Sequence, residues 1–395
     1  MGASLTENLG VPRWLKGTRT EFRPEYDLPG MKALVHVLEL TENPSSAFYV
    51  LPVAMRLAEK VVRLSLQDVP PREIPPGTSL IIVRYLNQRW RRWITANRAK
   101  FARLVLFLDD DIFDPTAWHS LPLGYRFKAW CLCARHLEWF RRVNIELWVS
   151  TPYLADKYHA WTPRLCLPSD IKGSPAIDSQ SPLHRRTSGR IHHKDCRSRG
   201  NDQLLGTRIA PNISHSIRVF YHGSSTHYPE LVWLRDIAMQ AGQLNPALTF
   251  ELIGNRSVQR LWRGVSNTRV VPEMTWPQYL EFTFSSQRDI GLAPLLPHPF
   301  NAARSHTKFF DITRTGAAGI YSDHPAFVSA LADGRCGTIV RNDPESWVEA
   351  IQALALDHDR RNTIANAARR RVDVLSHDAM IRNSSLLERE NASPS

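Results

Sequence analysis

One stretch of the sequence, residues 288–322 (RDIGLAPLLPHPFNAARSHTKFFDITRTGAAGIYS), has the order strand, loop, helix, strand. The largely apolar run at residues 289–294 is typical of a buried strand in a parallel sheet. After a loop, Ser305 or Thr307 is placed to cap a helix that ends near Gly316. Such a unit builds a parallel α/β sheet and sets the helix N-terminus at the carboxyl edge of the sheet. That edge favours a phosphate, because free backbone N–H groups and the helix dipole both attract an anion.

Two charged residues belong to this predicted helix. Lys308 falls in its first turn and Asp311 follows three residues later, so both side chains lie on one helix face about 5 Å apart. A cation beside the helix N-terminus suits a pyrophosphate, and a carboxylate one turn further along suits a pair of hydroxyls such as a ribose diol. The same spacing also fits a solvent-exposed ion pair that binds nothing, so both interpretations stay open.

A second phosphate signal follows the predicted strand at residues 217–221, where His222, Gly223 and Ser224 form a turn. The glycine permits close approach of a ligand to the backbone, and the serine hydroxyl can meet phosphate oxygens. His222 either contacts a sugar or phosphate, or is a loop histidine satisfied by its neighbours. Arg304, just before the helix of Lys308, either adds a second cation or lies in solvent.

Three adjacent carboxylates, Asp109, Asp110 and Asp111, follow the predicted strand at residues 104–108. At the carboxyl end of a strand they suit a metal ion, a general base, or a cap of the following turn. No second cluster of ligands accompanies them, which argues against a metal. Asp110 and Asp111 are the candidates for a general base.

The charge of the chain restricts its partners. At pH 7 the formal net charge is +12, which predicts attraction to something acidic: nucleotide phosphates, nucleic acid or an anionic membrane surface. Several of the twelve tryptophans lie beside arginines. In particular, the predicted helix at residues 88–102 is basic and carries Trp90 and Trp93. It either lies on an anionic membrane or covers a sheet.

The cysteines indicate a reducing compartment. They are odd in number and scattered, and none is arranged as a zinc site. We therefore expect reduced thiols in a cytoplasmic protein. No apolar run reaches the ~18–20 residues that a membrane span requires. The five are Cys131, Cys133, Cys166, Cys196 and Cys336.

Strands and helices alternate along both halves of the chain, which predicts parallel sheets. Between the halves, residues 169–215 are rich in Ser, Arg, His, Gly and Pro, and we expect a basic, disordered linker. The predicted fold class is α/β, with two Rossmann-like, doubly wound domains facing a cleft. The expected parts are an extension at 1–30, an N-terminal domain at 31–168, the linker, a C-terminal domain at 216–375, and a helical tail at 376–395. In the first half, strands are expected at 33–40, 80–85, 104–108 and 145–150. One helix is expected to end near Lys60, and another is expected over 125–142.

This arrangement resembles the GT-B glycosyltransferases, and most clearly their family 4 branch. In that branch a lysine contacts the donor pyrophosphate and a glutamate three residues later holds the ribose, just before an A-x-G-x-P segment. Lys308, Asp311 and residues 316–320 occupy those places here. The chain departs from the family in three ways: aspartate replaces that glutamate, Ala303 stands where the first of two paired glutamates would fall, and residues 43–46 (NPSS) replace a double-glycine turn.

The resemblance implies transfer of a sugar, of hexose type, from a nucleotide diphosphate to a hydroxyl of a glycan or lipid-linked acceptor. The donor would lie on the C-terminal domain, and Asn43 and Ser45 of the N-terminal domain would contact the acceptor. Lys308 and the helix N-terminus would stabilise the leaving pyrophosphate with no metal or other cofactor. An inverting enzyme needs Asp110 or Asp111 as base, whereas family 4 members retain configuration. The expected context is cell-surface polysaccharide or glycoconjugate synthesis, with the protein peripheral on the cytoplasmic face of a membrane.

Two other functions fit parts of the sequence. A sugar-nucleotide epimerase of the same fold would use the same donor site and need no acceptor. A basic nucleic-acid-binding protein would fit the net charge of +12. No aromatic-rich binding sheet or helix-turn-helix pattern supports that second alternative, so we expect no nucleic-acid partner.

Overall fold

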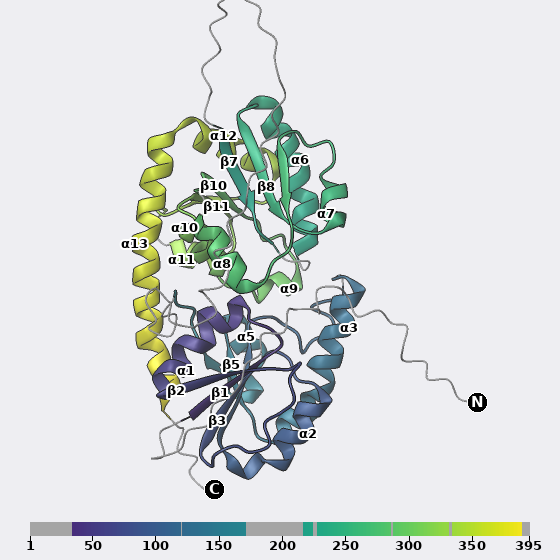
Figure 1. The fold of residues 1–395 in the computed structure, drawn as a ribbon. Coiled ribbons are helices and arrows are strands. Elements are labelled where there is room, and N and C mark those ends of the chain that lie inside the picture. Colours follow the sequence, from purple (N-terminus) through teal and green to yellow (C-terminus); the bar gives the residue numbers. More distant parts are fainter. Residues whose placement is uncertain are drawn as a thin grey trace, which may run out of the picture.

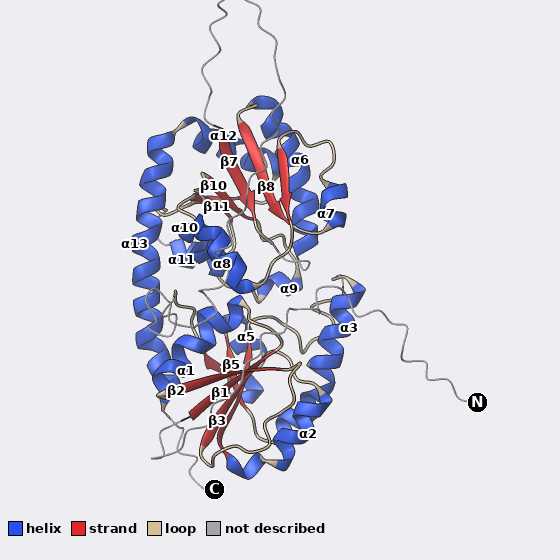
Figure 2. Ribbon diagram, viewed as in Figure 1, coloured by secondary structure: helices blue, strands red, loops and turns tan. Residues whose placement is uncertain are grey.

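The computed structural model describes residues 34–119, 121–170, 216–223, 227–285, 287–331 and 334–388. These form two α/β domains stacked one on the other (Figure 1). Each domain is built on one six-stranded sheet with helices on its faces (Figure 2), and all described neighbouring strands are parallel. The predicted fold class is therefore confirmed. The predicted extension at 1–30 and most of the predicted linker at 169–215 lie outside the described residues.

The N-terminal sheet has the strand order β2-β1-β3-β4-β5-β6. Its central strands are nearly continuous runs of Val, Ile, Leu and Phe because helices cover both faces. The order reverses between β1 and β3, and ligands bind at such a switch point in open α/β sheets. The strands are β1 (Leu34–Glu39), β2 (Lys60–Ser65), β3 (Thr78–Val83), β4 (Phe101–Leu108), β5 (Glu146–Val149) and β6 (Arg164–Leu165).

The helices of this domain cover its sheet. In α2, Trp90 and Ile94 are fully buried, and Asn87 caps the helix by accepting a hydrogen bond from the Trp90 N–H. Of the two roles expected for the basic tryptophan helix, this burial favours covering the sheet. The helices are α1 (Leu51–Leu57), α2 (Gln88–Ala96), α3 (Leu123–Leu132), α4 (Leu137–Arg142) and α5 (Pro152–Lys157), with short turns η2 (Ser46–Val50), η3 (Arg98–Lys100), η4 (Ala134–His136) and η5 (His159–Trp161).

The C-terminal sheet has the order β12-β11-β10-β7-β8-β9, so its switch point lies between β7 and β10. In β10, Gly291 lets helix α10 pack directly on the strand, because a Cβ there would come within 2.6 Å of the Ile312 side chain. The strands are β7 (Ile217–Tyr221), β8 (Leu248–Ile253), β9 (Thr268–Val271), β10 (Ile290–Ala293), β11 (Ala318–Ser322) and β12 (Thr338–Val340).

One long helix, α13, runs along both domains (Figure 1, yellow). The segment after it reaches the N-terminal domain, where Asn383 exchanges two 2.8 Å hydrogen bonds with the backbone of Leu167. The boundary predicted between 375 and 376 falls inside this helix. The helices are α6 (Tyr228–Leu244), α7 (Arg256–Leu261), α8 (Trp276–Ser285), α9 (Pro299–Ala302), α10 (Thr307–Arg314), α11 (Pro325–Leu331), α12 (Pro344–Leu356) and α13 (His358–Arg382), followed by η9 (Asn383–Leu387).

Three local predictions of secondary structure were wrong. The helix expected over 88–102 ends at Ala96, and Phe101 already belongs to β4. A helix was expected to continue to about Lys60, but it ends at Leu57 and Lys60–Ser65 forms edge strand β2. A single helix was expected over 125–142, but Cys133 leaves helical geometry with φ −140° and ψ −72° and separates α3 from η4 and α4. The four described cysteines are free thiols. Within the described ranges, no helix has the length and apolarity needed to cross a membrane.

Candidate active site between the two domains

The loop that leads from β10 to α10 joins the two domains. Phe300 and Ala303 of this loop are fully buried in the core of the N-terminal domain, and the Phe300 ring lies edge-on to Tyr125 at 5.6 Å between centroids. The next residue, Arg304, places its Nη1 atom 2.8 Å from Asp110 Oδ1. Ser305 shares a hydrogen bond with the Tyr49 hydroxyl. The carboxyl ends of β4 and β10 therefore meet at the domain interface.

Lys308 lies at the switch point of the C-terminal sheet, between the ends of β7 and β10. It lies in the first turn of α10, and its Nζ atom donates a hydrogen bond to the backbone carbonyl of His222 at the end of β7. Burial lowers the pKa of Lys308; the neighbouring carboxylate of Asp311 opposes this effect, and Arg304 adds to it. The structure thus brings together the two phosphate signals of the sequence, the turn after β7 and the N-terminus of α10.

Asp311 is not part of a solvent-exposed ion pair. Its carboxylate is buried, with Oδ2 3.6 Å from Lys308 Nζ and Oδ1 3.1 Å from Arg314 Nη1. The predicted cap is also different: the residue before α10 is His306, whose side chain makes no capping hydrogen bond. The prediction that Ser305 or Thr307 caps the helix is therefore wrong. Thr307 is the first residue of α10.

His222 is satisfied by its neighbours. Its Nε2 atom lies 3.2 Å from Glu251 Oε1, which also accepts a hydrogen bond from Arg288, and its Nδ1 atom lies 3.3 Å from the Tyr279 hydroxyl. Burial lowers the pKa of His222 to about 4, despite the opposing effect of Glu251. The neutral ring therefore serves the structure of the loop, while the backbone carbonyl faces Lys308.

Gly223 borders a cavity of about 370 Å³ at the carboxyl ends of β7, β8 and β9. Polar groups of Asn255 and Glu273 reach it from the other two strands, and Pro122 borders it from the N-terminal domain. A side chain at 223 would fit poorly, because a Cβ would come within 2.8 Å of the Tyr221 hydroxyl. Ser224, predicted as a phosphate contact, lies outside the described residues.

The three carboxylates after β4 point to different partners. Asp109 accepts a 2.5 Å hydrogen bond from Ser45, and burial raises its pKa while Arg84 opposes the shift. Asp110 is shared by Arg84 and Arg304, at 3.3 and 2.8 Å. The two base candidates thus differ in position, because Asp110 lies at the domain interface and Asp111 does not.

Asp111 is fully buried under α5. It accepts hydrogen bonds from Lys157, at 2.6 Å, and from Tyr158. Burial raises its pKa, and these two donors oppose the rise. Over the ranges that the structure describes, no three His, Cys, Asp or Glu side chains group as metal ligands.

A second crevice lies at the switch point of the N-terminal sheet, between the ends of β1 and β3. It encloses about 180 Å³, and Asn43, Arg84 and Lys128 are among its lining residues. Asn43, predicted to contact an acceptor, donates to Glu39 at 2.9 Å and accepts from Arg84 at 3.3 Å. Ser45, also predicted to contact an acceptor, is buried and donates a hydrogen bond to Asp109, and it is not among the residues that line the crevice.

Sequence reasoning missed a polar cluster beside Arg304. Asn301 of α9 donates a 2.7 Å hydrogen bond to Glu230 Oε1 of α6, and Glu230 Oε2 lies 3.8 Å from His227 Nδ1. Burial raises the pKa of Glu230, and burial together with Arg304 and Lys308 lowers that of His227. The one sequence signal was Pro229-Glu230 at a helix start, which is too common to single out.

No protein-family model matches this chain, and no curated protein matches it in sequence. Solved structures do match in fold. Sucrose-phosphate synthase from Thermosynechococcus elongatus superimposes with a TM-score of 0.54 and 12% identity, over 90% of this chain and 98% of the other. WaaG, a glycosyltransferase of lipopolysaccharide biosynthesis, gives 0.53 and 15%, over 90% and 100%.

TarM from S. aureus, solved with UDP, gives a TM-score of 0.50 and 8% identity, over 78% of this chain and 55% of TarM. The chain therefore spans about half the length of TarM. These likenesses, together with two parallel sheets whose switch points lie at the junction of the domains, show that this chain has the GT-B fold of glycosyltransferases.

Proposed function

We propose that the protein is a glycosyltransferase that moves a sugar from a nucleotide diphosphate to a hydroxyl of an acceptor. The observation that carries this proposal is the position of Lys308, whose ammonium lies at the N-terminus of α10 and contacts the end of β7. Both elements border the switch point, where parallel sheets bind phosphates. Arg304 stands four residues earlier at the same cleft and supplies a second cation.

The chemistry follows from these charges. When the bond between the anomeric carbon and the donor diphosphate breaks, negative charge develops on the leaving oxygen, and fixed cations beside it lower the barrier. Lys308, Arg304 and the α10 N-terminus provide this stabilisation in a buried setting, where such interactions are strong. We therefore propose that no metal takes part. The cavity beside Gly223 is of the size and position to hold the nucleoside.

The N-terminal crevice supplies the place for an acceptor. Asn43 lines it, and Asp110 lies between it and Arg304. In an inverting reaction the proton of the attacking hydroxyl would pass to Asp110, and in a retaining reaction to an oxygen of the leaving diphosphate. A nucleotide-sugar epimerase needs no acceptor, so the presence of this crevice favours a transferase. We also propose that the transferred sugar is a hexose.

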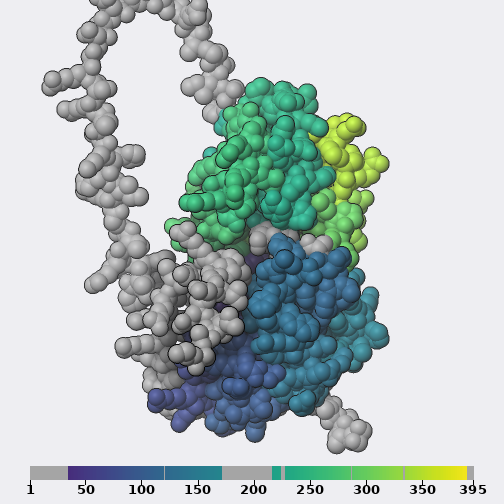
Figure 3. Space-filling view, turned by 90° about the vertical axis from the view of Figure 1, so that its right-hand side faces the viewer, coloured from purple at the N-terminus to yellow at the C-terminus, as the bar shows by residue number. Residues whose placement is uncertain are grey.

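Helix α3 supports contact with a membrane. Leu123, Phe127 and Trp130 recur along one face, and their side chains are 75, 69 and 51% exposed. Arg126 lies on the same face, and the chain carries a net charge of +12. An apolar stripe beside a cation suits an anionic lipid surface. We propose that α3 docks there, on the cytoplasmic face, in synthesis of a cell-surface polysaccharide or glycoconjugate. Figure 3 shows the side of the molecule that carries α3.

Calorimetric titration of UDP, GDP and ADP tests the donor site. We expect one nucleotide to bind the wild type, and Lys308→Ala to weaken its binding at least tenfold. Arg341→Ala removes an exposed cation from the same domain and serves as the matched control. If no nucleotide binds, or if the Lys308 variant binds as tightly as the control, the proposed function is wrong.

A further inference from the structure

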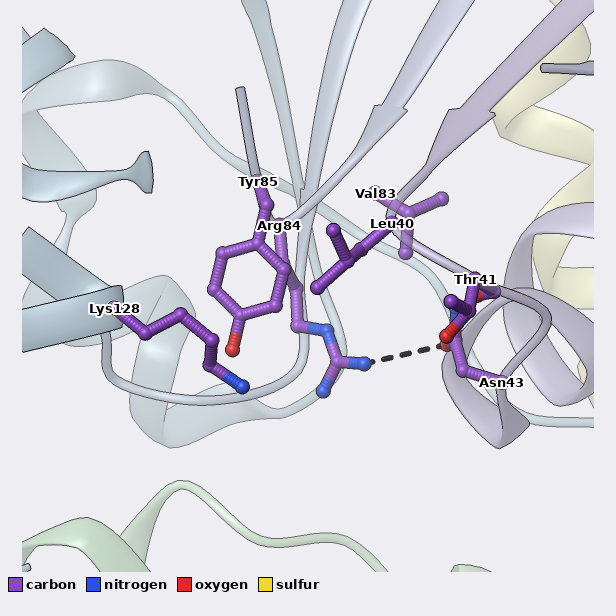
Figure 4. Close-up of a pocket in the computed structure, with 7 residues that line it drawn as sticks. All are labelled: Leu40, Thr41, Asn43, Val83, Arg84, Tyr85 and Lys128. Carbon is purple, nitrogen blue, oxygen red and sulfur yellow. Dashed lines mark hydrogen bonds between the residues drawn. The ribbon is translucent and has the colours of Figure 1, made fainter. Parts of the chain in front are cut away.

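The crevice in the N-terminal domain is lined by two cationic side chains. Arg84 comes from the end of β3 and Lys128 from α3, and both reach the same cavity of about 180 Å³. Figure 4 shows the guanidinium, the ammonium and the Tyr85 hydroxyl pointing to the same side, with Asn43 beyond the guanidinium. Three groups that can donate a hydrogen bond, the guanidinium, the ammonium and the Tyr85 hydroxyl, therefore converge on one small space.

Arg84 has an unusual backbone. Its φ angle is +62°, in the left-handed region that residues other than glycine rarely adopt. The Arg84 N–H donates a 3.0 Å hydrogen bond to the carbonyl of Phe107, so the pairing with β4 holds this conformation. Strained residues of this kind concentrate at binding and catalytic sites. Here the strained residue is the one that carries the charge into the crevice.

Within the described part of the chain, the polar contacts of the Arg84 guanidinium are all long. Nη1 lies 3.3 Å from Asp110, Nη2 lies 3.3 Å from Asn43, and Nε lies 3.6 Å from Asp109. A guanidinium has five N–H donors in a planar fork that matches the two oxygens of a carboxylate or phosphate. The two long hydrogen bonds leave donors available to such a group.

Lys128 is fixed by aromatic rings. Its Nζ atom lies 4.9 Å from the centroid of the Tyr85 ring and 4.8 Å from that of Tyr125. These cation–π contacts hold the ammonium at the crevice and keep its positive charge.

The side chains that line the crevice are positively charged. Among the described residues, the lining includes the cations Arg84 and Lys128 and no carboxylate, while Asp109 and Asp110 contact the Arg84 guanidinium without lining the cavity. A confined space lined by two cations favours a negatively charged ligand group.

We propose that this crevice binds an anionic group, phosphate or carboxylate, of the acceptor, so that the protein glycosylates an acidic molecule. This inference rests on the proposed glycosyl transfer, because it assigns the crevice to the acceptor. The anion accepts from the Arg84 fork and from Lys128, and a hydroxyl of the same molecule then faces the cleft near Arg304.

Phosphate titration tests the site directly. The donor site also attracts phosphate, so the parent protein for the titration is Lys308→Ala, and binding of inorganic phosphate is measured by calorimetry. We expect the added change Lys128→Gln to weaken this binding at least tenfold, and Lys128→Arg to preserve it. Arg126→Gln removes a neighbouring cation of the same helix that does not line the crevice, and we expect it to have no effect.

A second pair of probes distinguishes a soluble acceptor from a lipid-linked one. Glycerol phosphate and vesicles containing phosphatidic acid present the same phosphate monoester in soluble and lipid form. Binding that depends on Lys128 for glycerol phosphate and for phosphatidic acid vesicles, while binding to phosphatidylglycerol vesicles does not depend on it, assigns a lipid-linked acceptor. Dependence on Lys128 for glycerol phosphate alone assigns a soluble acceptor. Binding of both that is indifferent to Lys128→Gln overturns the proposal.

Failure of this inference differs from failure of the proposed function. If a nucleotide binds through Lys308 but phosphate binding ignores Lys128, glycosyl transfer stands and the acidic acceptor is wrong. If no nucleotide binds, glycosyl transfer is wrong and the assignment of the crevice to an acceptor falls with it. A thermal melt of each variant, with the same midpoint as its parent, shows that any loss of binding is not a loss of fold.

Discussion

Arg304 and Asp110 form a 2.8 Å ion pair that joins the C-terminal domain to the N-terminal domain. Their side chains are 18 and 4% exposed, and Arg84 approaches the same carboxylate from within the N-terminal domain. One carboxylate therefore holds two cations, one at the proposed donor site and one at the proposed acceptor crevice.

We expect Asp110→Ala to destabilise the protein by about 3–5 kcal/mol, because it removes a buried carboxylate that two largely buried cations share. Urea denaturation measures the change. Asp236→Ala, which removes an exposed carboxylate of α6, is the control and is expected to stay within about 0.5 kcal/mol of the wild type. Equal stability of the two variants would show that the ion pair does not hold the domains.

Gly223→Ala tests how closely the backbone after β7 must approach its ligand. The added Cβ would come within 2.8–2.9 Å of the Tyr221 ring and hydroxyl, so the loop has to shift away from its present position. We expect nucleotide affinity to fall at least tenfold. Gly124→Ala in α3 is the control, since a Cβ there meets nothing within 4 Å. If both alanine variants bind nucleotide like the wild type, the turn after β7 does not contact the donor.

The apolar stripe of α3 predicts binding to anionic vesicles. Changing Leu123, Phe127 and Trp130 together to Ser is expected to reduce co-flotation with vesicles that contain phosphatidylglycerol at least tenfold, because the apolar contact is lost. The control changes Leu244 and Phe284 to Ser; both are exposed apolar residues of the C-terminal domain. Equal flotation of the two variants would place any membrane contact elsewhere on the molecule.

Acid is expected to destabilise the fold through His36. Burial in β1 lowers its pKa from 6.5 to about 4, and neither ring nitrogen has a hydrogen-bond partner among the described residues. Below pH 6.5 His36 becomes protonated in the unfolded chain but stays neutral in the native protein. The free energy of unfolding therefore falls as the pH drops from 6.5 towards 4. The full loss from this one group is about 3 kcal/mol.

Denaturation at a series of pH values measures this effect. His36→Leu should flatten the fall in stability between pH 6.5 and 4, whereas His377→Leu, on the exposed face of α13, is the control. A pH dependence that is the same in wild type and His36→Leu would show that another group is responsible. His136, His222 and His306 also have a pKa lowered to about 4, mainly by burial, so part of the fall should remain in the variant.

Local patterns in the sequence were enough to predict the parallel sheets and the place of Lys308. Apolar runs such as β4 are buried on both faces, so their composition alone identifies them. Edge strand β2 was missed because its residues are half exposed and lack that signal. The break at Cys133 was missed because the residues on both sides favour a helix.

Only the local features of the candidate site could likewise be predicted from the sequence. The sequence by itself determined that a lysine and an aspartate lie at the start of one helix after a buried strand, because helix periodicity is local. Only the tertiary structure decided that Arg304 faces Asp110, that Glu230 meets Asn301, and that Lys128 shares a crevice with Arg84. These partners lie far apart in the chain, and side-chain contacts between them arise only when two sheets and their loops pack together.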